Sequence, residues 1–186
     1  SFQRAVRAPN IQELFLPHGL NLFDMSQDPC SDGVPGGVSA GGYTQADCAR
    51  SGLPAIAWGR NLDSPAGQYN FLQGGNPDLA PEEADTWSYG VVFTPDFIEG
   101  LAVTVDYYDI QIEDGISNLD QEFILTECLE GNEAQCANVQ RSANGDLWVG
   151  SDVVNSGKIV ALQDNLAVEE VTGVDIIATY DFDMGS

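Results

Sequence analysis

The sequence predicts an all-β fold, an antiparallel meander of long strands with long loops and one or two short helices. Three observations favour this class. Three stretches alternate large apolar with smaller or polar residues. The segments between them are rich in Gly, Pro, Asn and Asp. No run of eighteen apolar residues exists, so no transmembrane helix is expected, whereas barrel strands leave a much weaker hydropathy signal.

The clearest strand covers residues 85–94, after two prolines and an Asn-Pro step that exclude regular structure. One face is large and mostly aromatic, and the other is small and mostly polar. The first face carries Trp87, Tyr89, Val91 and Phe93, and the second carries Thr86, Ser88, Gly90 and Val92. A half-buried soluble strand fits this pattern, and so does a barrel strand between lipid and water.

A tight turn at 94–100 leads to a second strand at 101–113, so residues 85–113 are predicted to form a hairpin. Val103, Val105 and Tyr107 share one face of the second strand. The pattern inverts after Tyr108, which predicts a bulge or a departure from the apolar environment.

A third strand is expected at about 171–182, within a terminal strand segment 169–186. Val174, Ile176 and Tyr180 lie on one of its faces. The chain opens and stops inside strand-like runs, so we expect it to be a piece of a longer protein.

Two long loops are expected, an irregular one at 9–74 and a second at 114–168. They contrast with the short turn of the hairpin, and outer-membrane barrels show this asymmetry. The expected helices and short strands are 44–51 with Thr44 as N-cap, 118–129 capped by Ser117 or Asn118 and ended by Gly131, 147–149 and 158–162.

The four cysteines form two local pairs. Their spacing does not match zinc sites, and the chain has one histidine, so disulfides Cys30–Cys48 and Cys128–Cys136 are favoured over four reduced thiols. Disulfides imply an oxidising compartment.

The chain has 29 acidic and 6 basic residues, a net charge of −23. This balance argues against nucleic acid and anionic lipid surfaces as partners. It favours solubility or cationic partners and disfavours strongly anionic ligands unless a cation bridges them.

No motif supports catalysis, a cofactor or a metal. Residues 37–41 match G-x-S-x-G, but Ser39 lies among glycines in a loop, without the strand and helix that a nucleophile needs. His18 has no partners spaced for a metal. Arg50 and Arg60 are the candidate ligand contacts, because few other side chains could hold a carboxylate or phosphate.

Four segments carry a family resemblance. GNPDLAPEEADTWSYGVVFTP at 75–95 resembles a signature of TonB-dependent outer-membrane receptors, in the C-terminal half of the barrel. RAVRAPNIQELF at 4–15, LAVTVDYYDI at 101–110 and VTGVDII at 171–177 resemble further segments of the family, in the same order.

The resemblance implies part of a 22-stranded transmembrane β-barrel in the outer membrane of a Gram-negative bacterium. Its implied role is TonB-dependent uptake of a siderophore, haem, vitamin, oligosaccharide or peptide, without enzymatic activity. Outer-membrane lipid, a small nutrient ligand and, through a plug missing from this chain, the TonB complex would be its partners. The candidate lipid-facing residues are Trp87, Tyr89, Val91, Phe93, Val103, Val105, Tyr107, Val174, Ile176 and Tyr180.

A secreted, disulfide-stapled all-β binding module is the alternative function. It explains the acidity, cysteines and aromatics, but not the four ordered segments. Burial of Trp87 and Val91 in an interior core would favour it. For a barrel piece, we expect the isolated chain to self-associate through its unpaired strand edges.

Overall fold

The computed structural model describes residues 1–182, which divide into two compact units. The strand unit and the loop unit are each discontinuous in sequence. The strand unit comprises 1–9, 80–116 and 165–182, and the loop unit comprises 10–79 and 117–164.

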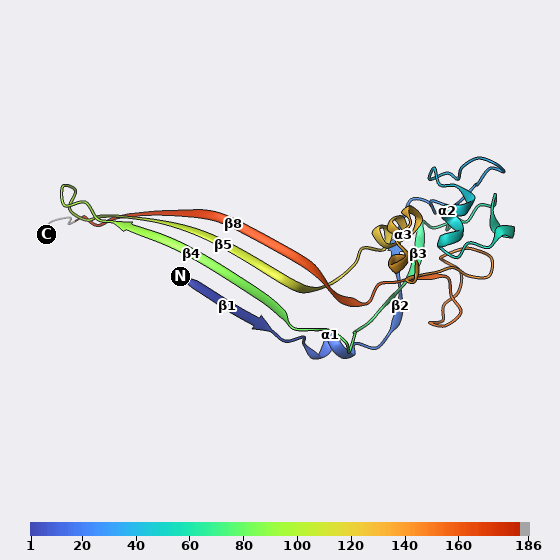
Figure 1. The fold of residues 1–186 in the computed structure, drawn as a ribbon, viewed down its shortest axis with the longest axis horizontal. Helices are drawn as coiled ribbons and strands as arrows, with labels where there is room; N and C mark the ends of the chain where they lie inside the picture. The colour runs from blue at the N-terminus through green and yellow to red at the C-terminus, as the bar shows by residue number, and fades with distance from the viewer. Residues whose placement is uncertain (183–186) are drawn as a thin grey trace. The chain divides into compact units, whose positions relative to one another are not determined.

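The strand unit is a four-stranded sheet in the order β1-β4-β5-β8 (Figure 1). Its strands are β1 (Phe2–Arg7), β4 (Glu82–Phe93), β5 (Leu101–Asn118) and β8 (Gln163–Tyr180). The three alternating stretches therefore form strands, as predicted from their period of two. Each begins or ends several residues beyond the expected bounds, because the regular pairing continues into segments without a clear apolar alternation.

The β4–β5 hairpin has an unbroken antiparallel register. Pairing runs from Glu83 opposite Glu113 to Phe93 opposite Val103 without an inserted residue. The bulge offered as one explanation of the inverted pattern is therefore wrong for this span. Each face of β5 keeps its direction: the face of Val105 changes from apolar to polar after Tyr107, and the opposite face becomes apolar at Ile110 and Ile112. A departure from the apolar environment is the other explanation given above.

The loop unit contains a second sheet, so the expectation of an irregular region at 9–74 was wrong, whereas the short strand expected at 158–162 is present at Lys158–Val160. Its order is β2-β3-β7-β6, and β3 pairs with β7 in parallel. The parallel pair joins the first loop to the second, since the partners are far apart in sequence. The strands are β2 (Gly19–Asp24), β3 (Gln68–Gln73), β7 (Lys158–Val160) and β6 (Val139–Gln140).

The described residues hold more helices than the one or two expected. They are α1 (Ile11–Phe15), α2 (Gln45–Arg50), α3 (Gln121–Glu130), α4 (Glu133–Cys136) and the 3-10 helix η1 (Ala55–Ala57).

Two of the helices were expected from sequence. Thr44 caps α2, as predicted, in a reciprocal capping box with Asp47. The N-cap of α3 is Asp120, not Ser117 or Asn118, and Gly131 ends the helix with a φ of 107°.

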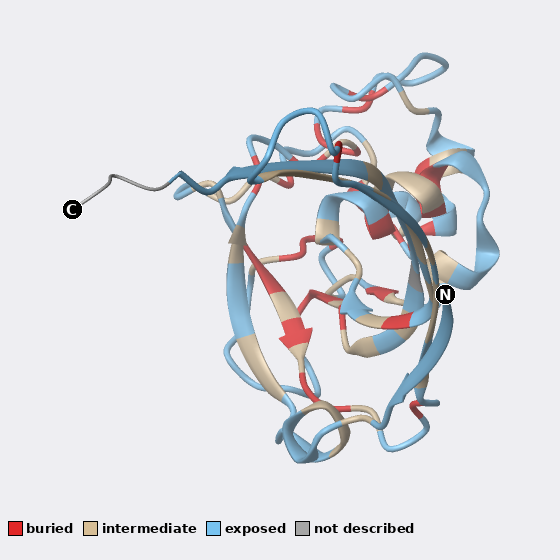
Figure 2. Ribbon diagram, turned by 90° about the vertical axis from the view of Figure 1, so that its left-hand side faces the viewer, coloured by how far each residue is buried: buried red, intermediate tan, exposed pale blue. Residues whose placement is uncertain are grey.

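The loop unit has its own hydrophobic core. Figure 2 shows buried residues concentrated in the loops and short elements and almost absent from the long strands. Both predicted disulfides are present, and three of their four cysteines are buried in this core. Leu147 is also buried there, although 147–149 is not a strand. The other large, fully buried apolar side chains are Tyr69, Ile124, Leu125, Leu129 and Ile159.

Among residues 1–182, no helix combines the length and the apolar character needed to cross a bilayer.

Candidate functional site

One face of the strand unit gathers large apolar side chains. The register places Trp87, Tyr89, Val91 and Phe93 of β4 on the same face as Val103, Val105 and Tyr107 of β5, and we call this the Trp87 face. Phe2 lies opposite Trp87, with ring centroids 4.6 Å apart, and the rings of Trp87 and Tyr89 stack at 6.4 Å. The result is a continuous apolar band with a cluster of aromatic rings at the Trp87 end and Phe93 at the hairpin end.

The opposite face, which we call the Gly90 face, has mostly small residues on β4 and mixes polar residues with Tyr108 on β5. Gly90 lies opposite Asp106, whose carboxylate occupies the space that a side chain at position 90 would need. A side chain at Gly173 of β8 would run into the ring of Tyr108, so Gly173 is also on this face. Strand alternation then directs the remaining lipid-facing candidates toward the Trp87 face: Val174, Ile176 and Tyr180.

Beyond Trp87 the apolar band gives way to charged residues. Asp109 lies opposite Trp87, and Arg4 makes two hydrogen bonds with Asp85, at 2.7 and 2.6 Å. Arg7 is paired with Glu82. The two arginines of the N-terminal motif thus pair with the strand that follows the long first loop. Pairs this exposed add little to stability, because water and salt screen them.

A buried ion pair joins the two loops. The guanidinium of Arg141 donates to both carboxylate oxygens of Asp28, at 2.5 and 3.0 Å, and both side chains are fully buried. It also donates to Ser51 Oγ at 2.9 Å and to the carbonyl of Gly145 at 2.8 Å. Asp28 accepts a further bond from the backbone N–H of Cys30. Arg141 therefore links the second loop to two separate positions of the first loop.

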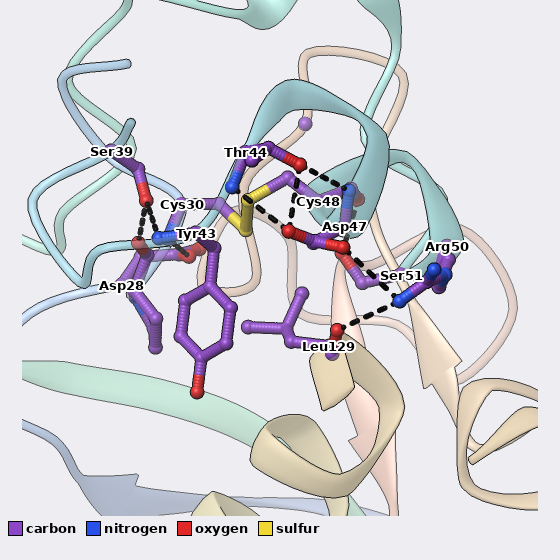
Figure 3. The surroundings of a disulfide bond; sticks show 12 residues. Asp28, Cys30, Ser39, Tyr43, Thr44, Asp47, Cys48, Arg50, Ser51 and Leu129 are labelled. Carbon is purple, nitrogen blue, oxygen red and sulfur yellow. Dashed lines mark hydrogen bonds and ion pairs between the residues drawn. A yellow bond between two sulfur atoms is a disulfide. The ribbon is translucent and has the colours of Figure 1, made fainter. Parts of the chain in front are cut away.

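Arg50, one of the two candidate ligand contacts, already has protein partners. Its guanidinium donates to Asp47 at 3.1 Å and to the carbonyl of Leu129 at 3.2 Å, beside the Cys30–Cys48 disulfide (Figure 3). These bonds connect α2 to the C-terminal end of α3. Because its donors are partly occupied, Arg50 has less capacity for a ligand than the sequence analysis assumed.

Arg60, the other candidate, differs from Arg50. Its backbone groups hold the turn after η1 and accept from Asp32, but its guanidinium has no protein partner within residues 1–182. Arg60 is an exposed residue. Among the described residues no hydrogen bond joins Arg50 to Arg60, and the cavity beside Arg50 is lined by Gly131, Glu133 and Cys136.

Ser39 has a structural environment. Its hydroxyl donates to the carbonyl of Pro29 at 2.6 Å and accepts from the backbone N–H of Tyr43. His18 instead contacts the carbonyl of Gly75 at 3.1 Å. No hydrogen bond within residues 1–182 joins this serine to a histidine, as a general base would require.

A cavity that the sequence analysis missed lies in the loop unit, between the segment after β2, the segment before α2 and helix α3. Its volume is about 220 Å³. Tyr43 and Glu122 line it with polar groups, and Met25 and Leu125 provide buried apolar surface. Across residues 1–182, no group of three or more His, Cys, Asp or Glu side chains is arranged to hold a metal ion.

An antiparallel sheet with one apolar and one polar face, bearing large loops, is the arrangement found in the wall of an outer-membrane β-barrel. The family model "TonB dependent receptor-like, beta-barrel" matches residues 1–185. The chain belongs to this family.

The solved structure of the siderophore receptor PirA from Pseudomonas aeruginosa is similar at 15% identity, with a TM-score of 0.43. The similarity covers 94% of this chain and 20% of that one, so the chain spans about a fifth of the receptor's length. No curated protein matches the chain significantly.

Proposed function

We propose that this chain is part of an outer-membrane receptor that takes up a small nutrient with energy from TonB. The strand unit would form barrel wall, and the loop unit would contribute to the ligand-facing surface. Membership of the receptor family supports this role. The nutrient would be a siderophore, haem, vitamin, oligosaccharide or peptide, and no enzymatic step is needed.

The observation that carries the proposal is the division between the Trp87 face and the Gly90 face. A barrel strand needs apolar residues toward lipid and small or polar residues toward the lumen. The register provides this arrangement across β4 and β5, and Val91 in the middle of the band is 68% exposed. Aromatic rings at the end of the band match the interfacial girdles of such barrels.

The loop unit supports a binding role because its groups are preorganised. Two disulfides, a buried ion pair and an inter-loop sheet fix its conformation before any ligand arrives. Within this unit Arg60 remains our candidate contact for a carboxylate or phosphate of the nutrient. Arg50 is a weaker candidate because of its bonds to Asp47 and Leu129.

The alternative, a secreted binding module, requires the aromatic strand face to be an interior core. Trp87 is 47% exposed and is not part of the buried core, which lies entirely in the loop unit. A water-soluble module would leave this apolar band in solvent at a large free-energy cost. The arrangement therefore favours the barrel.

Two adjacent substitutions in the full-length receptor test the membrane role. Val91→Arg places a charge on the Trp87 face and should cost about 2–4 kcal/mol if the position is near the bilayer midplane. Val92→Arg, its matched control, places the same charge on the Gly90 face. Heat-modifiable gel mobility measures the folded fraction in the outer membrane. Equal tolerance of both variants would contradict the assignment of the lipid face.

Uptake tests the transport role. The full-length receptor is expressed in a Gram-negative host that lacks its own receptors, with and without TonB, and growth on each of the five nutrient classes is scored. Growth on one class, only with TonB present, is the expected result. Secretion of the full-length protein into the medium, with no TonB-dependent growth, would instead support the binding module.

A further inference from the structure

The cavity beside α3 has an apolar floor and a polar rim. Met25 and Leu125, the floor residues, are 5% and 0% exposed. The rim consists of polar side chains from three separate segments of the loop unit: Ser26, Gln27, Tyr43, Glu122 and Thr126. Its volume of about 220 Å³ is below the usual size of a drug-sized site, so it suits one arm of a ligand.

The polar groups of the rim are available. Within residues 1–182, the side chains of Gln27, Tyr43, Glu122 and Thr126 have no hydrogen bond to protein, whereas Ser39 and Thr44 nearby are both engaged. In Figure 3 the hydroxyl of Tyr43 points away from the disulfide. The rim therefore presents one carboxylate, two hydroxyl groups and an amide among its unused groups.

The electrostatic environment of the rim is negative. Glu122 is the only charged residue that lines the cavity. Burial raises the pKa of the Tyr43 phenol, and the nearby carboxylates of Glu130 and Asp47 raise it further. Arg50 offsets Asp47 in part through their 3.1 Å contact, but no basic residue lines the cavity.

We propose that this cavity binds a protonated amine carried by the imported nutrient. The ammonium group would lie between the Glu122 carboxylate and the Tyr43 ring, since a carboxylate and an aromatic face both attract a cation. Its alkyl stem would lie on Met25, beside the fully buried Leu125. This assignment rests on the proposed uptake function for its biological meaning, but its chemistry can be tested separately.

The rim disfavours anionic ligand groups and gives neutral groups weaker contacts than an ammonium group. An anionic group would meet the Glu122 carboxylate without a cation to balance it, on a chain of net charge −23. A neutral hydroxyl would keep hydrogen bonds to Gln27 or Thr126 but would lose the charge-assisted contact and the cation–π contact.

The test uses the full-length receptor in detergent, labelled with ¹³C at the methionine methyl groups, with Met25→Leu to assign the Met25 signal. Pentylammonium is the probe, and 1-pentanol is its neutral counterpart of similar length. We expect pentylammonium to shift the Met25 methyl resonance in a saturable way, with an affinity about ten-fold higher than that of 1-pentanol.

Glu122→Gln should weaken pentylammonium binding about five- to ten-fold and leave 1-pentanol unchanged. The matched control is Glu127→Gln on the same helix, whose side chain contacts Asn132 at 3.2 Å and does not line the cavity. It should change neither affinity.

Three results would each overturn the amine site. They are equal affinities for the two probes, no saturable shift with either probe, and equal effects of the two Glu→Gln variants. These results are independent of uptake. Selective ammonium binding without TonB-dependent uptake would refute the proposed function and leave the site. TonB-dependent uptake without selective ammonium binding would refute the amine site and leave the proposed function.

Discussion

Removal of Arg141 should loosen the loop unit more than removal of any other cation. Arg141→Met keeps an apolar stem of similar length and deletes the guanidinium. Asp28 then keeps the backbone N–H of Cys30 but loses both charged contacts. Ser51 Oγ and the carbonyl of Gly145 lose a donor as well.

The expected cost follows from complete burial of the pair. Both side chains are 0% exposed, so Asp28 would be left as an uncompensated buried carboxylate. Removing one partner of a buried ion pair costs about 3–5 kcal/mol. At about 1.4 kcal/mol per factor of ten, this corresponds to a loss of roughly two to nearly four orders of magnitude in the opening equilibrium.

Hydrogen exchange in the full-length receptor is the suitable assay, because it reports local opening without requiring the barrel to unfold. The reporters are inter-loop amides, namely Asn70 N–H to the carbonyl of Leu147 at 2.9 Å and Ala161 N–H to the carbonyl of Leu72 at 2.9 Å. Their protection should fall in Arg141→Met if the pair holds the loops together.

The matched control is Arg50→Met, which removes a pair whose arginine side chain is 47% exposed and should change the protection little. Arg141→Met combined with Asp28→Leu should recover much of the loss, because replacing both members of a buried pair is often neutral or stabilising. Equal protection changes in Arg141→Met and Arg50→Met would refute the reasoning.

Three further predictions follow from other contacts. Replacing Cys30 and Cys48 together by Ala should destabilise the loop unit by about 3 kcal/mol, given a separation of 18 residues, and hydrogen exchange with and without reductant checks it. Gly173→Leu should displace Tyr108 and so reduce the folded fraction on heat-modifiable gels. Tyr108→Ala in the same chain should restore the folded fraction, and failure to restore it would contradict the contact between the two residues. Hydrogen bonds from Thr44, the N-cap residue of α2, hold the pKa of Asp47 below its ordinary value of 3.8. The ionised Asp47 therefore stabilises the folded state fully above pH 3.8, and this stabilisation is lost as the pH falls through the lower folded-state pKa. Exchange of the first-turn amides of α2 should therefore accelerate only below about pH 3.8, and Asp47→Asn should remove this dependence.

The strands of the strand unit were predictable because their pattern is local. A period of two over many residues needs no knowledge of the partner strand. The face that holds Trp87 and Val91 was therefore assigned from sequence alone. The partner residues were not, since register depends on the turn and on side chains across the hairpin, and this is why the inversion after Tyr108 could not be separated from a bulge.

The second sheet was missed for a physical reason. β3 carries Tyr69, Asn70, Phe71 and Leu72, of which three are buried, so it shows no alternation of apolar and polar residues. Its neighbours come from both loops, and its parallel partner β7 has only three residues. Such a strand is stabilised by contacts distant in sequence, which composition cannot reveal. The richness of these loops in Gly and Asn indicated turns, which are present, but not the core between them.

The candidate contacts were predictable only as residue types. A chain with six cations leaves few choices for an anion-binding group, which singled out Arg50 and Arg60. Their difference depends on Asp47 and on the carbonyl of Leu129, which are supplied by folding. The amine cavity left no sequence signal, because Tyr43 and Glu122 are far apart in the chain and typical of any surface.

The positions of the basic residues show where the net negative charge of the chain is left uncompensated. Arg141 and Lys158 are buried, and the Lys158 ammonium donates to the carbonyl of Ser156. Arg50 is paired with Asp47, which leaves Arg60 as the exposed cation of the loop unit without a protein partner in the described residues. The acidic side chains on its surface are therefore largely uncompensated, and the resulting field attracts cationic groups. A nutrient with an ammonium arm for the Glu122 cavity and an acidic group for Arg60 would be compatible with both of our proposals.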